Sequence, residues 1–334
     1  MQNISGTLLF SQAPGIISYA SVVGQKEGEG PLRDDFDRVI GDMYAGQKTF
    51  EQAESVLVRE AVSAALSKGG VRPCDVDAAF AGDLLNQCVA TSFGFKDFRF
   101  PYIGLYGACS TMALGLISSA VAVESKAARI AVSAASSHYC TAERQYRFPL
   151  EYGSQRPPTA QWTVTGAGAC IVGEKNEEGL PRITAATVGI IKDLGITDQN
   201  NMGAAMAPAA ADTIARYLRS TGEDIRSFDA IYTGDLGKIG SKLLHELLRE
   251  QGIDIRHVHK DCGKLIFSEN DDVHAGGSGC GCCASVLCGH ILNRMRMGLE
   301  KNILFIATGA LLSPTTTLQG ETIPSIAHLV NIRI

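Results

Sequence analysis

The stretch "VDAAFAGDLL", Val76–Leu85, returns later in the chain as "FDAIYTGDLG", Phe228–Gly237. Five residues recur in the same order and at the same spacing. They are Asp77, Ala78, Gly82, Asp83 and Leu84 in the first copy and Asp229, Ala230, Gly234, Asp235 and Leu236 in the second. A single short match can arise by chance, so the segments around each copy decide whether the whole chain is a repeat.

A helical pattern precedes each copy. Glu51–Gly70 places its apolar residues on one face and ends in two glycines, and Pro208–Gly222 repeats this arrangement and stops at its own glycine. The similarity therefore extends beyond the two short stretches.

The segments after the two copies also correspond. Residues 101–136 and 253–310 each read as strand, sharp turn, helix and strand, and a closing strand is expected at Gly166–Glu174 and at Ile326–Ile334. Alternating strands and helices predict parallel sheets with helices on their faces. We therefore predict an α/β protein of two similar halves. The halves are residues 1–178 and 179–334.

The composition excludes several classes of protein. The chain has 334 residues, 45% of them apolar, a net charge of −5 and no basic block, so nucleic acid is not an expected partner. The first residues do not read as a signal peptide, and the longest apolar run, Asn302–Leu312, is too short to span a bilayer. We expect a soluble protein whose ten cysteines are reduced thiols.

The candidate site lies where the two halves place equivalent turns. "YGACST", Tyr106–Thr111, puts Cys109 between a strand and a helix, which is where an enzyme places a thiolate nucleophile. "GGSGCGCCAS", Gly276–Ser285, occupies the same position in the second half. Because sites in such sheets form where strand ends meet helix starts, a pseudo-two-fold axis would bring both turns into one central cleft.

These motifs resemble those of the thiolase superfamily. "YGACST" is similar to the nucleophile turn of this superfamily. Trp162–Glu174 is similar to the aspartate-glycine-alanine-glycine-alanine strand of its ketoacyl synthase branch, and Gly279–Ser285 is similar to the asparagine-bearing turn of that branch. The resemblance implies a thiolase-like duplicated fold of two mixed-sheet halves in five layers (αβαβα). It also implies a homodimer, which we expect to pair Arg129–Ser137 across a two-fold axis.

The sequence departs from the catalytic pattern of this superfamily. Gly234 and Asp235 stand where the synthase branch carries its histidine, and Cys280 stands where the asparagine is expected. A carboxylate near the Cys109 thiol would raise its pKa rather than lower it. We therefore expect a protein that is not an enzyme, the alternative being an active acyl-CoA thiolase or ketoacyl-synthase-type acyltransferase that uses Cys109.

The same departures resemble the stage V sporulation protein AD family. The resemblance is carried by "GDLLNQ" (82–87), "PYIGLYGACSTM" (101–112), residues 136–169 and "GDLGKIG" (234–240). It implies binding of dipicolinic acid (pyridine-2,6-dicarboxylate), with or without calcium, for uptake into the developing spore. No cofactor is implied. The implied place is the forespore cytoplasm, peripherally on the spore inner membrane, with membrane proteins of the dipicolinate channel as partners.

Eight residues are candidate ligand contacts. They are Asp83, Cys109, Ser110, His138, Asp235, His274, Gly279 and Cys280. The N–H groups at the two helix starts attract carboxylates, and the histidines can donate to them. The aspartates can instead cap the next helix or face calcium, and each histidine can instead be a loop residue bonded to backbone.

Three further interpretations concern individual segments. The cysteines of residues 280–288 lack the paired spacing of a structural zinc site, so we expect no metal there, and "GAGAC" is not a dinucleotide fingerprint. The arm Gly24–Thr49 is polar and is expected to be an exposed insertion. Residues 139–162 are expected at the cleft mouth and dimer interface, with a solvated loop as the alternative.

Overall fold

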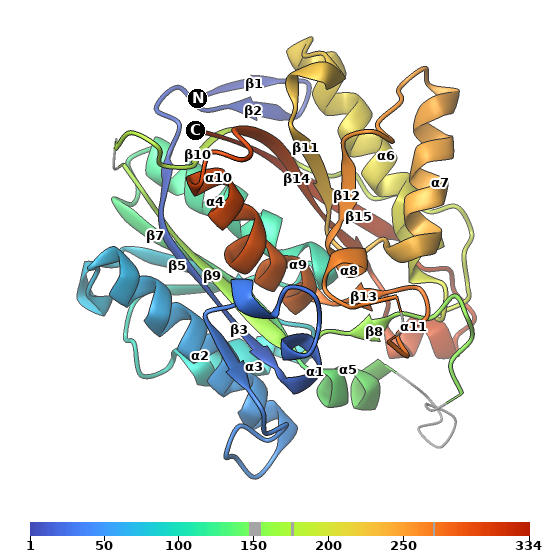
Figure 1. The fold of residues 1–334 in the computed structure, drawn as a ribbon, viewed down its shortest axis with the longest axis horizontal. Coiled ribbons are helices and arrows are strands. Elements are labelled where there is room, and N and C mark those ends of the chain that lie inside the picture. The colour runs from blue at the N-terminus through green and yellow to red at the C-terminus, as the bar shows by residue number, and fades with distance from the viewer. Residues whose placement is uncertain (147–154, 175–176, 270) are drawn as a thin grey trace.

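The structure is a computed structural model that describes residues 1–146, 155–174, 177–269 and 271–334. Its main strands form two sets (Figure 1). The first set is β3 (Gly15–Gly24), β5 (Ala78–Gly82), β6 (Tyr102–Gly104), β7 (Ile130–Ser137) and β9 (Gly166–Gly173). The second set is β10 (Arg182–Thr187), β11 (Ala230–Thr233), β12 (His259–Asp261), β14 (Asn302–Ala310) and β15 (Ser325–Arg333).

Both sets have the same spatial order. The first runs β6–β5–β7–β9–β3 and the second β12–β11–β14–β15–β10, so each reads third, second, fourth, fifth, first along its half of the chain. The duplicated fold is thereby confirmed. The two sets meet where β10 pairs with β3 at Arg182 and Gly15.

The strand directions make each half a mixed sheet. β5 pairs in parallel with β7, and β11 with β14, as alternating strands and helices predict. The closing strands β9 and β15 run antiparallel to both of their neighbours. A sheet of parallel strands alone would therefore have been the wrong description of either half.

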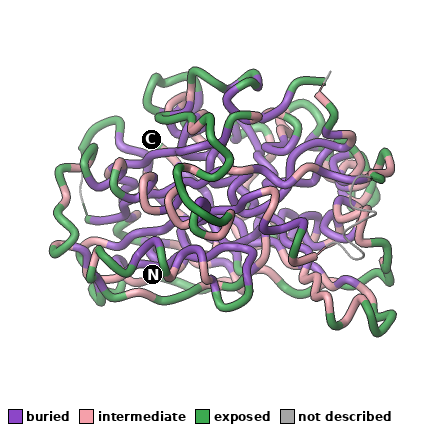
Figure 2. The backbone as a smooth tube through the Cα atoms, turned by 90° about the horizontal axis from the view of Figure 1, so that it is seen from below, coloured by how far each residue is buried: buried purple, intermediate pink, exposed green. Residues whose placement is uncertain are grey.

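Helices on both sides of the two sheets give five layers (Figure 1). The outer helices are α2 (Phe50–Gly69) and α3 (Val89–Phe95) on the first sheet and α6 (Met202–Thr221) and α7 (Gly237–Glu250) on the second. The central helices are α4 (Thr111–Glu124) and α9 (Cys280–Val286). Figure 2 shows that the buried segments lie in the interior of the molecule and that the exposed segments lie mainly at its periphery.

The remaining elements connect these layers. They are β1 (Gln2–Ile4), β2 (Thr7–Leu9), α1 (Gln25–Gly28), β4 (Arg38–Ile40), α5 (Tyr139–Tyr146), β8 (Trp162–Thr163), α8 (Cys262–Leu265), β13 (Gly277–Ser278), α10 (Leu292–Arg296) and α11 (Pro314–Leu318). Among them, β8 and β13 form a separate two-stranded ladder that joins the two halves beside the central helices.

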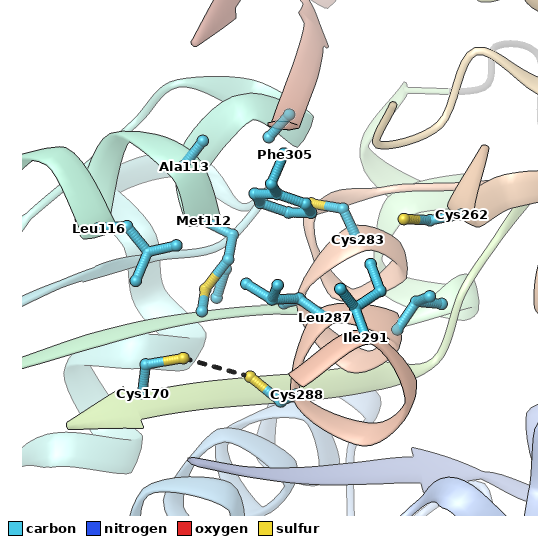
Figure 3. Close-up of a cluster of buried hydrophobic side chains, with 14 of the residues drawn as sticks. Met112, Ala113, Leu116, Cys170, Cys262, Cys283, Leu287, Cys288, Ile291 and Phe305 are labelled. Atoms are coloured by element: carbon cyan, nitrogen blue, oxygen red, sulfur yellow. Dashed lines mark hydrogen bonds between the residues drawn. The ribbon is translucent and has the colours of Figure 1, made fainter. Parts of the chain in front are cut away.

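The central layer is a core shared by both halves. Figure 3 shows Met112 and Leu116 of α4 beside Cys283 at the start of α9 and Phe305 of β14. α9 approaches β9 so closely that a Cβ at Gly168 would lie 2.2 Å from the Ala284 carbonyl oxygen. Since real Cβ atoms do not come that close, only glycine fits at this position.

Helix boundaries follow the predicted signals in one case and tertiary packing in the other. Gly70 ends α2 with a left-handed φ of 62°, as predicted, and the Thr49 side chain caps its start, which the sequence analysis did not identify. α6 begins at Met202, before the expected Pro208, which lies inside the helix. The extra turn is held because Gly203 packs directly against Gly240 of α7.

The expectation of an exposed insertion at residues 24–49 holds only for its second part. Residues 41–49 are mostly exposed, but Glu27, Leu32 and Phe36 are buried. β4 pairs in parallel with β3, so the arm folds back on the first half. Because the arm is polar overall, the sequence analysis did not identify the three buried side chains that anchor it.

The expected pairing of Arg129–Ser137 across a two-fold axis is wrong. This segment contains β7, which lies between β5 and β9 and hydrogen-bonds to both. No edge of β7 is left for a second chain. β6 ends the strand order of the first half, so β6 is the edge of that sheet.

Candidate functional site

The Cys109 turn is a strained connection. Ala108 has a left-handed φ of 50°, which is unfavourable for a residue with a side chain. Two hydroxyls hold the turn, since Ser110 Oγ donates to the Gly107 carbonyl at 2.6 Å and Thr111 Oγ1 to the Ala108 carbonyl at 2.7 Å. Ser110, a predicted ligand contact, thus uses its hydroxyl to bond to the backbone of the turn.

The equivalent turn of the second half meets Cys109, as the pseudo-two-fold argument predicts. Gly279 begins α9 with a φ of 101°. Ser278 Oγ lies 4.0 Å from Cys109 Sγ, and the Cys283 thiol lies 3.6 Å from the Cys109 carbonyl oxygen. Both turns therefore share one centre.

Asp235 organises this centre through its hydrogen bonds. Its buried carboxylate accepts hydrogen bonds from Thr308 Oγ1 at 2.7 Å, Ser278 Oγ at 2.8 Å and the Gly279 N–H at 3.0 Å. Burial raises the pKa of Asp235, and these donors act in the opposite direction. The carboxylate thus ties β11 to β14 and to the start of α9.

The Cys109 thiol is held in its protonated form. Burial raises its pKa well above the ordinary value, and the Asp235 charge raises the pKa further. This is the direction that the sequence predicts from an aspartate in place of histidine. A reactive cysteine needs the opposite environment, with a cation or imidazole that lowers the pKa.

A cavity with a volume of about 60 Å³ lies beside Cys109. Its walls are mostly small or apolar. They are Leu84, Ala108, Cys109, Ala142, Glu143, Tyr146, Thr163, Gln199, Met202, Ser278, Gly279, Ala310 and Leu312. This set of described residues contains one acid and no lysine, arginine or histidine.

Asp83 lies behind the cavity rather than in its wall. It accepts from Thr91 Oγ1 at 2.6 Å and from the N–H groups of Thr91 and Leu85, so it holds the loop after β5. Cys280 follows Gly279 and is fully buried, and burial raises the pKa of its thiol well above the ordinary value.

Glu54 is a buried acid that the sequence interpretation missed. It accepts from Thr141 Oγ1 at 2.7 Å and from Ser136 Oγ at 3.2 Å, and burial followed by the Asp83 charge raises its pKa well above the ordinary value. A signal was present, because Glu54 interrupts the apolar face of the helical pattern that contains Ala53 and Leu57.

The two candidate histidines lie outside the Cys109 cavity. His138 Nε2 lies 2.9 Å from the Met43 carbonyl oxygen, and its Nδ1 accepts from the Cys140 N–H at 3.2 Å. His274 has a left-handed φ of 51°, and its Nε2 lies 3.5 Å from Asp272. The structure therefore brings Cys109, Asp235, Gly279 and Cys280 together, but neither histidine.

The comparisons with known proteins agree with this geometry. Residues 5–333 match the family described as stage V sporulation protein AD. The chain belongs to that family. A curated relative, stage V sporulation protein AD of Bacillus subtilis, is 43% identical over 322 residues, which cover 96% of this chain and 95% of the relative.

Solved structures similar to this sporulation-family chain show its fold. OleA of Xanthomonas campestris, solved with cerulenin, has a TM-score of 0.63 at 13% identity and covers 98% of both chains. The 3-oxoacyl-[acyl-carrier-protein] synthase III of Aquifex aeolicus has a TM-score of 0.58 at 12% identity, over 96% of this chain and all of its own. The thiolase-like fold is thus confirmed.

The cysteines around α9 contact different neighbours. Cys282 Sγ lies 3.6 Å from the Gly234 carbonyl oxygen, whereas Cys288 Sγ lies 3.6 Å from Cys170 Sγ (Figure 3). Across the described part of this stage V sporulation protein AD relative, no three histidine, cysteine, aspartate or glutamate side chains are grouped to hold a metal ion. Nor does any helix in that part have the length and apolarity to cross a membrane.

The cavity wall also contains residues that sequence interpretation did not single out in this sporulation-family chain. Ala142, Glu143 and Tyr146 come from α5, Met202 begins α6, and Gln199 lies in the loop before α6. The sequence placed residues 139–162 at the cleft without identifying individual contacts. Residues 147–154 of that segment lie outside the described residues.

Proposed function

We propose that this member of the stage V sporulation protein AD family is a binding protein rather than a catalyst, and that it takes dipicolinic acid in the cavity beside Cys109. The observation that carries the proposal is the buried Asp235 carboxylate at the place where acyl-transfer chemistry needs an imidazole. That carboxylate raises the pKa of the Cys109 thiol and so opposes thiolate formation.

The charges at the cavity favour the calcium chelate over the free dianion. Glu143 lines the cavity, Asp235 accepts hydrogen bonds from Ser278 and Gly279 of its wall, and the described wall contributes no basic side chain. A bare dicarboxylate would meet these acids unfavourably, whereas calcium neutralises the ligand and accepts oxygen donors. The N–H groups of Ser110 and Thr111 at the start of α4 already bond to the carbonyls of Gly107 and Ala108, so they do not serve as donors for the carboxylates of the ligand.

The walls of the cavity can adjust around a ligand. The half-buried side chains Tyr146 and Met202 line it and can swing outward, as interface side chains commonly do when a ligand enters. Binding should therefore depend on space as well as on charge.

A titration of the purified protein with dipicolinate, with and without calcium, tests the proposal. We expect saturable binding that is stronger with calcium. Cys109→Ala should keep most of the affinity because no covalent bond is needed, whereas Ala142→Phe should abolish binding by filling the cavity. Picolinate, which lacks one carboxylate, should bind more weakly by about 1.5–3 kcal/mol, the typical contribution of a charge-assisted hydrogen bond.

Two results would overturn the assignment. Equal affinity in Ala142→Phe and the parent protein would place the ligand elsewhere, provided that both melt at similar temperatures. If no saturable binding occurs in the presence of calcium, dipicolinic acid is not the ligand of this protein.

The retained Cys109 at a helix start supports one alternative, an active acyl-CoA acyltransferase. Incubation with acetyl-CoA and acetoacetyl-CoA, followed by intact mass measurement, separates the two functions. We expect neither an acyl adduct nor turnover. An adduct on Cys109 together with turnover would establish the alternative.

We also propose the cellular setting that the family suggests. The protein would act as a homodimer on the forespore side of the spore inner membrane and pass its ligand to membrane proteins during uptake. Co-purification of the tagged protein with membrane proteins from sporulating cells, lost on stripping with high salt, would support this peripheral association.

A further inference from the structure

A second cavity, with a volume of about 290 Å³, lies under the arm of residues 24–49. Its walls come from the arm, α2, α5 and β8. They are Gly24, Gln25, Lys26, Glu27, Glu29, Ile40, Asp42, Met43, Ala45, Ala53, Leu57, His138, Tyr139, Trp162 and Thr165. None of these residues lines the cavity beside Cys109.

The wall of this second cavity contains a buried carboxylate that is only partly satisfied. Glu27 is 1% exposed, and its Oε1 accepts from the Thr165 N–H at 2.9 Å. Its Oε2 has no hydrogen-bond partner in the described structure. The carboxylate lies between Thr165 and Gly24, both of which also line the cavity.

A buried carboxylate with one oxygen left without a hydrogen bond is costly, because the remaining donors repay only part of the desolvation of the charge. Burial accordingly raises the pKa of Glu27 to about 7, although the Thr165 amide and the Lys26 charge act in the opposite direction. A hydrogen-bond donor that occupies the cavity and reaches Oε2 would remove this cost.

The other walls indicate what kind of donor fits. Glu27, Glu29 and Asp42 contribute acids, and the basic side chains among the lining residues are Lys26, whose Nζ lies 4.6 Å from the centre of the Trp162 ring, and His138. The remaining surface includes the polar side chains of Gln25 and Thr165 but is mostly apolar, as at Leu57, Met43 and the stacked rings of Tyr139 and Trp162. The cavity therefore combines a negative wall with an apolar body.

We propose that this cavity binds a small organic ammonium ion, with its N–H donors on the Glu27 carboxylate and its apolar body between Leu57, Met43 and the Trp162 edge. The site goes beyond the proposed dipicolinate function and does not depend on it. α5 and β8 separate the two cavities, since Tyr139 and Trp162 face this cavity while Ala142 and Thr163 face the other.

The single tryptophan of the chain makes the test specific, because Trp162 lines the proposed site. The full-length protein is titrated with benzylammonium chloride while tryptophan fluorescence is followed. We expect a saturable change, weakened about tenfold or more in Glu27→Gln, which keeps the shape and removes the charge. Glu29→Gln, which removes an exposed acid of the same wall, should change the affinity less than about threefold.

Benzyl alcohol and Ala142→Phe complete the design. Benzyl alcohol has the same ring without the charge and should bind much more weakly, and Ala142→Phe alters only the first cavity and should leave the benzylammonium titration unchanged. The proposal is overturned if no saturable change occurs, if benzyl alcohol binds as tightly as benzylammonium, or if Glu27→Gln binds like the parent while melting normally.

Discussion

At the residue scale, the Cys109 centre keeps a nucleophile position while its electrostatics are reversed. The sequence predicted this reversal, because Asp235 follows its strand at the place of the synthase histidine, and the structure confirms the raised pKa of the thiol. Glu54 and Tyr146 were missed, since their positions depend on contacts between α2, α5 and the loop after β5. Local patterns do not encode such contacts.

The first prediction concerns the reactivity of Cys109. At pH 7.5 iodoacetamide should label the exposed Cys74 and leave Cys109 largely unmodified, because the buried thiol is protonated. Asp235→Asn removes the neighbouring charge and should speed labelling of Cys109. Peptide mass spectrometry measures both rates.

Ser278→Ala is the matched control, since it removes one hydrogen bond of Asp235 but leaves the charge in place. Labelling of Cys109 in this variant should stay slower than in Asp235→Asn. Labelling of Cys109 in the parent protein as fast as Cys74 would contradict the electrostatic account.

The second prediction concerns Glu27 and pH. Its pKa rises from 4.5 to about 7 on folding, so the native state holds this proton more tightly than the unfolded state. Stability from this group is complete below pH 4.5 and is lost as the pH rises toward 7 and above, by about 3 kcal/mol in all. Glu27→Gln removes this loss.

The melting temperature of Glu27→Gln relative to the parent should therefore be higher at pH 8 than at pH 4.5. Other titrating groups are common to both proteins and cancel in the difference. An equal difference at both pH values would show that the carboxyl group does not titrate in this window.

At the element scale, the sequence predicted the presence of helices better than it predicted where they end or how neighbouring segments pack on them. α2 was predicted from its apolar face and its glycine stop, which are local signals. The start of α6 and the burial of the arm were not, because the close contact of Gly203 with Gly240 and the anchors Leu32 and Phe36 involve residues far apart in the sequence. Such contacts override local preference.

The third prediction tests the packing of α9 on β9. Gly168→Ala should destabilise the protein by about 1–3 kcal/mol, because the added methyl group would lie 2.2 Å from the Ala284 carbonyl oxygen and must push the helix start away. Urea unfolding followed by circular dichroism measures the change. Because the shift displaces the Gly279 turn, dipicolinate affinity should fall as well.

Gly41→Ala is the control, since a Cβ there meets nothing within 4 Å and its φ is not left-handed. Its midpoint of unfolding should match the parent or rise slightly. If both alanine variants unfold alike, the close approach of α9 to β9 does not constrain the fold.

At the scale of the whole molecule, the repeated stretch predicted the duplication because the helix and strand patterns on both sides of it recur as well, and the structure shows that both copies are the second strand of their half. The direction of the closing strands was not predictable in the same way. A strand of alternating or continuous apolar residues looks the same in either direction, and its direction is set by where the preceding connection crosses the sheet. β9 and β15 consequently turned out antiparallel.

The last prediction concerns assembly, and the sheet topology decides where it can occur. β7 has neighbours on both sides, so the proposed homodimer must use another surface. β6 is the edge of the first sheet, and Ile103 on it is 52% exposed. An exposed edge with an apolar side chain is suited to pair with a second copy across a two-fold axis.

Ile103→Lys should therefore convert the dimer into a monomer of 35.4 kDa in sedimentation at micromolar concentration. Ile190→Lys, at a position with a similar exposure of 49% outside β6, should leave the dimer intact. A parent protein that sediments as a monomer would refute the dimer, and equal behaviour of the two lysine variants would place its interface away from β6.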